Sequence, residues 1–275
     1  MNAAAAKELP IGVFDSGVGG LTVLKALREA MPHEDLIYLG DTARLPYGTK
    51  SPASISRYAG QATALLQQRN IKLLVVACNT ASAVALETLR SQMDPLPVIG
   101  VVEPGAAAAV AARPAGRHLV LATEATVCLG AYRNALVSRD SRAAVTELAC
   151  ELLVSLAEEG WNDGSIAESI VLRYLSELPD SAREPDSVIL GCTHFPLLKG
   201  TFEAVFDDTV AIVDSASTTA VAANELLDEL SLGREATGGG NLTLLATDGA
   251  TRFARVGGQF LGEELTWRDI EVVDL

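Results

Sequence analysis

Long apolar runs, aromatic side chains and positive charge are all scarce in this 275-residue sequence. No stretch approaches the roughly 18 consecutive apolar residues that a membrane-spanning helix needs. The first residues, MNAAAAKELP, lack the basic region followed by an apolar stretch that marks an export signal. We therefore expect a cytoplasmic protein that does not contact a membrane.

Basic residues are outnumbered by acidic ones. Lysine and arginine total 21 against 35 aspartates and glutamates, which gives a net charge of −14 and a pI near 4.6. This balance disfavours nucleic-acid binding, because phosphates need a basic surface. It also repels small anions at long range, so an anionic ligand must be held by local N–H groups and hydroxyls.

Cysteine is present at four positions, Cys78, Cys128, Cys150 and Cys192, and none of them forms a C-x-x-C pair. In a chain without an export signal these cysteines are expected to be free thiols. Their spacing disfavours a zinc site, and no other metal site is predicted.

Apolar runs alternate with segments of helical spacing, which predicts an α/β fold with mainly parallel strands. Hydrophobic residues make up 49% and charged residues 20% of the chain, so most of it is globular. Nine strands are too many for one open sheet, and we therefore expect two lobes. The expected strands span residues 11–15, 36–41, 71–77, 97–102, 118–123, 187–191, 209–214, 242–247 and 270–275.

Two segments share one design. VVACNTASA at 75–83 and VILGCTHFPLL at 188–198 each run from an apolar strand to a cysteine, where a helix can begin. Polar residues follow each cysteine: Asn79 and Thr80 after Cys78, and Thr193 and His194 after Cys192. Because α/β proteins bind ligands at the carboxyl ends of parallel strands, the two cysteines would face each other across one cleft.

Two such thiols would suit inversion of a carbon stereocentre. A base removes a proton from one face and an acid returns one to the other, and since enantiomers have equal free energy each group must serve in both roles. A thiol can do so, as thiolate or as thiol. The alternative is that a cysteine after a buried strand merely packs in the core. Cys128 and Cys150 lack the matching context and are assigned to packing.

Other polar clusters leave alternatives open. The DSGVGG segment at 15–20 could hold an anion with backbone N–H groups, or form a tight turn in which Asp15 caps the next helix. It fits neither the phosphate-loop nor the dinucleotide pattern. His194 could tune the ionisation of Cys192 or serve as an exposed or capping histidine. Glu103 and Glu158 have no assignment from spacing.

Several motifs together resemble glutamate racemase, within the aspartate/glutamate racemase superfamily, over nearly the whole chain. They are IGVFDSGVGGLTV, YLGDTARLPYG, ACNTASA, GVVEPGA, ATEATV, GCTHFPLL and VDSA. The resemblance implies cofactor-independent interconversion of L- and D-glutamate, which supplies D-glutamate for bacterial peptidoglycan. It also implies two pseudo-symmetric lobes, 1–98 plus 212–275 and 99–211, with the active site between them, and a homodimer.

The same resemblance implies roles for individual residues. Cys78 and Cys192 would be the acid/base thiols on opposite faces of the substrate α-carbon, with Asp15 assisting Cys78 and His194 assisting Cys192. The expected substrate site comprises Asp15, Ser16, Pro46, Tyr47, Gly48, Asn79, Thr80, Thr193 and His194.

Four positions depart from the family pattern. Ala122 stands where glycine is common, Leu129 where serine is common, and Glu151 and Ser155 where prolines are usual. We expect these positions to lie away from the cysteine motifs and to affect only local loop shape and the dimer contact.

Three other readings compete. One is a racemase of the same superfamily that acts on aspartate. Another is a regulatory contact with DNA gyrase, which some glutamate racemases inhibit. Such inhibitors tend to carry an N-terminal extension, whereas about nine residues precede the first expected strand here. The third is a hydrolase that uses Cys192 and His194, although positions so close in sequence seldom give the required geometry.

Overall fold

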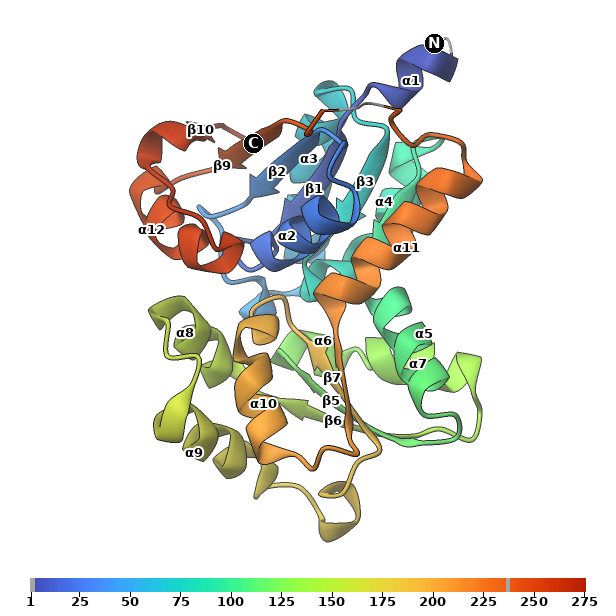
Figure 1. Ribbon diagram of the computed structural model, residues 1–275, viewed down its shortest axis with the longest axis vertical. Helices are drawn as coiled ribbons and strands as arrows, with labels where there is room; N and C mark the ends of the chain where they lie inside the picture. The colour runs from blue at the N-terminus through green and yellow to red at the C-terminus, as the bar shows by residue number, and fades with distance from the viewer. Residues whose placement is uncertain (1–2, 236–237) are drawn as a thin grey trace.

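Two parallel sheets lie one beyond the other along the long axis of the molecule (Figure 1), in a computed structural model that describes residues 3–235 and 238–275. Within these residues the larger sheet has the order β10-β9-β2-β1-β3-β4 and the smaller has the order β6-β5-β7-β8. All pairings are parallel. The expected α/β fold with two sheets is confirmed. The strands are β1 Ile11–Asp15, β2 Leu36–Gly40, β3 Leu73–Val76, β4 Val98–Gly100, β5 Arg117–Ala122, β6 Ala144–Ala149, β7 Ser187–Gly191, β8 Ala211–Asp214, β9 Leu242–Ala246 and β10 Ile270–Val272.

Helices cover both faces of the larger sheet. One face packs on α2 (Leu21–Ala30), α11 (Ser215–Glu229) and α12 (Ala250–Leu261), and the other packs on α3 (Pro52–Gln68) and α4 (Asn79–Met93). The start of α3 follows its sequence signals, since Ser51 Oγ accepts a hydrogen bond from the Ser54 N–H and Pro52 is the first helical residue. A short helix, α1 (Ala3–Lys7), precedes β1.

The smaller sheet is covered in the same way. One face packs on α8 (Glu151–Glu159), α9 (Gly164–Leu175) and α10 (Lys199–Val205), and the other on α5 (Val102–Ala112) and α7 (Ala131–Arg139). A short helix, α6 (Glu124–Cys128), follows β5. Figure 1 shows these two groups on opposite sides of the lower sheet. Single turns of 3₁₀ helix occur at Tyr47–Thr49, Asp180–Ala182, Phe195–Leu198 and Trp267–Asp269.

One strand was not expected from the sequence. β6 is an edge strand whose residues are only half-buried, and its sequence AVTELA contains Ala, Glu and Leu, which favour helix. The strand expected at 97–102 is also shorter than predicted, because it ends at Gly100 and α5 begins at Val102.

The expected lobe boundaries fall within strands. The 98/99 boundary lies inside β4 of the larger sheet, and the 211/212 boundary lies inside β8 of the smaller one. We propose that the chain passes between lobes just after each of these strands, so that each sheet keeps its strands whole. No helix in the described part of the chain is long and apolar enough to cross a membrane.

Candidate active site

A pocket at the junction of the two lobes gathers nearly all of the predicted site residues. It receives side chains that follow β1 and β3 of the larger sheet and β5 and β7 of the smaller one, at the carboxyl ends of parallel strands. Asp15 is the one predicted site residue that does not line it, and three lining residues were not predicted: Thr123, Glu151 and Val154. The pocket is lined by Ser16, Pro46, Tyr47, Gly48, Cys78, Asn79, Thr80, Thr123, Glu151, Val154, Cys192, Thr193 and His194.

Cys78 occupies the cap position of α4, just after β3. Its Sγ accepts a hydrogen bond from the Ala81 N–H at 3.4 Å and lies 3.4 Å from Ser16 Oγ, to which the thiol can donate. Burial raises the pKa of Cys78 to about 12, and the nearby Asp15 carboxylate adds to the effect. Cys78 is therefore a protonated thiol at neutral pH.

Asp15 ends β1 and is almost fully buried. Its Oδ2 accepts a hydrogen bond from the Gly17 N–H at 2.9 Å, whereas its Oδ1 has no hydrogen-bond partner among the described residues. Burial raises the pKa of Asp15, while the charge of His194 opposes that rise. Asp15 does not cap α2, because Gly20 holds the cap position without a side-chain bond, so the capping interpretation was wrong.

On the other side of the pocket, Cys192 heads a chain of polar contacts. Its Sγ lies 3.7 Å from His194 Nδ1, and His194 Nε2 lies 3.2 Å from Glu158 Oε1. The other Glu158 oxygen accepts a bond from Arg252 Nη2 at 2.7 Å. Burial alone would lower the pKa of His194, but its bonds to Cys192 and Glu158 raise it to about 10. The His194 ring meets Phe260 edge-on with centroids 5.2 Å apart.

The glycine-rich loop after β1 reaches across to the Cys192 segment. A Cβ on Gly19 would lie 2.5 Å from His194 Nδ1, so only glycine permits this approach. Thr22, at the start of α2, donates its hydroxyl proton to the Thr193 carbonyl at 2.8 Å. The loop therefore helps to hold the Thr193 and His194 segment in place.

The hydroxyl of Tyr47 is held by the buried carboxylate of Asp41. Its hydroxyl donates to Asp41 Oδ2 at 2.6 Å, and Arg44 forms an ion pair with the same carboxylate at 2.8 Å. Burial and the Asp41 bond raise the pKa of Tyr47, so the hydroxyl stays protonated. Gly48 lies against Thr123 of the other lobe, which a Cβ would meet at 3.2 Å.

Asn79 and Thr80 join the lobes at the base of the pocket. Asn79 Oδ1 accepts a bond from the Tyr132 hydroxyl at 2.7 Å. Thr80 Oγ1 lies 3.0 Å from Thr123 Oγ1 and 3.4 Å from Thr126 Oγ1. Thr123 thus belongs to a buried cluster of hydroxyl groups that spans both lobes. Because this cluster forms between segments far apart in the sequence, spacing along the chain does not reveal it.

The position of Glu151 corrects one expectation. This residue was expected to lie away from the cysteine motifs, but it lines the pocket together with both cysteines, because α8 begins beside that pocket. Its Oε1 accepts a hydrogen bond from the Glu124 N–H at the start of α6. Leu129 and Ser155 are exposed and do not line the pocket.

All four cysteines are free thiols. Cys128 is exposed at the end of α6, and Cys150 is buried at the start of α8. Within residues 3–235 and 238–275 there is no group of three or more His, Cys, Asp or Glu side chains that could hold a metal ion.

Residues 11–223 match the family described as Asp/Glu/Hydantoin racemase. The chain belongs to this family. The expected membership in the racemase superfamily is thereby confirmed, and with it the expectation of an enzyme.

Individual members are similar over nearly the whole chain. A protein of Geobacter metallireducens named glutamate racemase is 48% identical over 255 residues, which cover 93% of each chain. A structure of glutamate racemase from Francisella tularensis in complex with D-glutamate is 34% identical, covers 98% of both chains and gives a TM-score of 0.88. These similarities support glutamate racemase function.

An aspartate racemase of Picrophilus torridus has a more distant structure. It is 17% identical, with a TM-score of 0.58, and the match covers 82% of this chain and 94% of that one. At this identity the likeness shows only that the fold is shared.

Proposed function

We propose that this protein interconverts L- and D-glutamate without a cofactor, with Cys78 and Cys192 as the two acid/base groups. The observation that carries the proposal is that one thiol from each lobe lines a single pocket. A racemase needs its two proton-transfer groups on opposite faces of one carbon, and two lobes that meet at a pocket supply such faces.

Each direction of the reaction moves one proton on and one proton off the α-carbon. One thiolate removes the α-proton and becomes a thiol, while the other thiol donates its proton to the opposite face and becomes a thiolate. Exchange of the thiol protons with solvent restores both groups for another turnover in the same direction, and a turnover in the reverse direction restores them directly. The protonated state of Cys78 suits it to the role of acid.

On the other side of the pocket, a positively charged group lies beside the sulfur of Cys192. His194 is protonated at neutral pH because its pKa is about 10, and its Nδ1 lies 3.7 Å from Cys192 Sγ. A positive imidazolium beside the sulfur stabilises negative charge there. Cys192 is therefore suited to act as base when Cys78 is the acid.

The Cys78 side must also lose a proton in the reverse direction. The ammonium group of a bound amino acid brings a positive charge into the pocket, which favours the thiolate. Asp15 Oδ1 is buried without a partner among the described residues, and its carboxylate can balance that ammonium charge. In this proposal Asp15 assists Cys78, and His194 assists Cys192.

Loss of the α-proton next to a carboxylate builds up negative charge, which the pocket must stabilise. Hydroxyl, amide and backbone donors at Ser16, Asn79 and Thr193 line the pocket and can hold the two carboxylates of glutamate. Because the chain as a whole is acidic, such local donors are the means of binding an acidic substrate. We assign Pro46, Tyr47, Gly48 and Thr80 to the same substrate site.

The first experiment is proton NMR of L-glutamate in deuterated water with purified protein and no added cofactor, followed by chiral analysis. Loss of the α-proton signal together with formation of D-glutamate is expected. Folded protein that exchanges the α-proton of L-aspartate but not that of L-glutamate would contradict the assigned substrate. Absence of exchange with both substrates would contradict racemisation itself.

We further propose that the protein is a cytoplasmic homodimer that supplies D-glutamate for peptidoglycan. Light scattering tests the dimer, and growth of a depleted strain with added D-glutamate tests the supply. A contact with DNA gyrase has no supporting observation in the structure, and unchanged supercoiling by gyrase in the presence of the protein is expected.

A further inference from the structure

We propose that Arg252 is a positioning residue that fixes Glu158, and through it His194, across the junction of the two lobes. The inference rests on the proposed racemisation and names a residue to which neither the motifs nor the comparisons assign a role. Arg252 lies on α12, which packs on the larger sheet, whereas Glu158 lies on α8, which packs on the smaller one.

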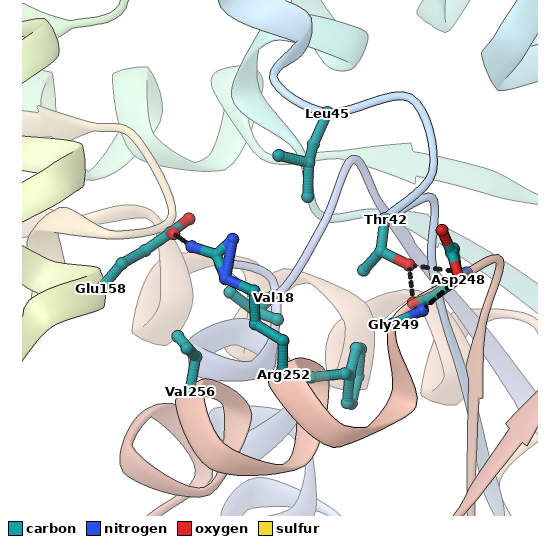
Figure 2. A pocket seen from close by; sticks show the side chains of 9 residues that line it. Val18, Thr42, Leu45, Glu158, Asp248, Gly249, Arg252 and Val256 are labelled. Carbon is teal, nitrogen blue, oxygen red and sulfur yellow. Dashed lines mark hydrogen bonds and ion pairs between the residues drawn. The ribbon is translucent and has the colours of Figure 1, made fainter. Parts of the chain in front are cut away.

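The geometry divides the Glu158 carboxylate between two partners. Figure 2 shows Arg252 reaching from its helix to Glu158 across the junction. Oε2 accepts a bond from Arg252 Nη2 at 2.7 Å, and Oε1 lies 3.2 Å from His194 Nε2. Because each oxygen has its own partner, the carboxylate cannot turn without losing one of them.

Apart from His194, no cationic side chain among the described residues pairs with Glu158 in place of Arg252. In the described part of the chain its ion-pair partners are His194 and Arg252. The walls of the neighbouring pocket are largely apolar and include Val18, Leu45 and Val256. The one other charged group that lines this pocket is Asp248. If Arg252 is removed, Glu158 keeps only its contact with His194, and its Oε2 has no ion-pair partner among the described residues to fix the orientation of the carboxylate.

Titratable groups face His194 on three sides. Cys192 and Glu158 contact its two ring nitrogens, and the charge of Asp15 interacts with it from β1. Arg252 acts on this set through Glu158, whose pKa is lowered chiefly by its bond with His194 and further by Arg252. Without Arg252, Glu158 Oε2 loses the one bond that holds it among the described residues, so the carboxylate beside His194 Nε2 is no longer fixed in orientation, while the contacts of Cys78 stay unchanged.

This one-sidedness has a measurable consequence. L- and D-glutamate have equal free energies, so kcat/KM must change by the same factor in both directions. The primary isotope effects on kcat/KM, in contrast, can differ between the two enantiomers. If proton transfer at Cys192 becomes slower, the isotope effect on kcat/KM measured with C2-deuterated substrate rises for the enantiomer that Cys192 deprotonates. The same isotope effect falls for the enantiomer that Cys78 deprotonates.

The test compares Arg252→Met with Arg255→Met. Both arginines are exposed on α12, and Arg255 forms no ion pair among the described residues, so the two variants carry the same charge change. Because an ion pair of a half-exposed arginine contributes little to stability, Arg252→Met should fold. We expect kcat/KM to fall about tenfold to a hundredfold in Arg252→Met, as a misplaced catalytic group predicts. Arg255→Met should match the wild type, and Arg252→Lys should recover part of the loss.

The Cys192→Ala variant shows independently which enantiomer each thiol deprotonates. In this variant only the enantiomer that Cys78 deprotonates should still exchange its α-proton. Opposite changes in the two isotope effects of Arg252→Met support the positioning role. Equal changes, or kinetics identical to those of Arg255→Met, overturn it. A wild-type protein that leaves glutamate unchanged overturns the proposed function instead, so the two failures are distinguishable.

Discussion

The Thr22 hydroxyl donates a hydrogen bond to the backbone carbonyl of Thr193, 2.8 Å away in the other lobe. The same hydroxyl lies 2.9 Å from the Gly19 carbonyl. Both partners are buried, and Thr193 directly follows Cys192. The position of the second thiol therefore depends on a residue of the first lobe.

Replacing Thr22 by valine should remove this contact while keeping the shape of the side chain. We expect a loss of about 1 kcal/mol in the free energy of unfolding, since a buried carbonyl loses its donor. Urea unfolding measures the loss, and a parallel racemisation assay should show a lower kcat. Thr22→Ser keeps the hydroxyl and is the matched control. Equal stability of the valine and serine variants would argue against the bond.

Gly19→Ala tests the close approach of the loop to His194. The added Cβ would lie 2.5 Å from the His194 ring, so the loop or the ring must move. We expect kcat/KM to fall about a hundredfold, because displacement of a catalytic group by about 1 Å has effects of this size. Gly200→Ala is the control, since a Cβ there meets nothing within 4 Å. Wild-type kinetics in Gly19→Ala would contradict the geometry.

Most of the fold could be predicted from periodicity, and the exceptions have physical reasons. β1 and β7 agree with their expected bounds because they are fully buried apolar runs that end at Asp15 and Gly191. β6 was missed because it is a half-buried edge strand of helix-favouring residues, which the contact with β5 turns into a strand. Local propensity was overridden there by tertiary pairing.

The site residues that belong to local sequence motifs could be predicted. Cys78 and Cys192 each follow a buried strand, and that position places them at the edge where the sheets face the pocket. Glu158 and Arg252 could not be found in this way, because they are 94 positions apart and meet only through the packing of α8 and α12 across the lobes. Spacing along the chain carries no signal of such a contact.

Single substitutions of the two thiols should show which face of the substrate α-carbon each thiol serves. Cys78→Ala and Cys192→Ala are each expected to abolish racemisation, while each still exchanges the α-proton of one enantiomer, and a different enantiomer in the two variants. Proton NMR in deuterated water, started separately from L- and D-glutamate, measures this. Cys128→Ala, at an exposed thiol outside the pocket, should behave as the wild type. Exchange of the same enantiomer in both alanine variants would contradict a two-base mechanism.

The bond network of His194 should also be visible in the pH dependence of stability. Burial alone would lower the pKa of His194, but its bonds to Cys192 and Glu158 raise it to about 10, against about 6.5 in an unfolded chain. The folded state therefore binds the proton more tightly than the unfolded state does. This contribution to stability is fully present below pH of about 6.5 and is lost as the pH rises through about 10. We expect the unfolding free energy of the wild type to fall more steeply over this window than that of His194→Asn, as measured by urea unfolding at a series of pH values. The difference between the two curves reports His194 together with the groups that it contacts, and parallel curves would show that its pKa is not raised by folding.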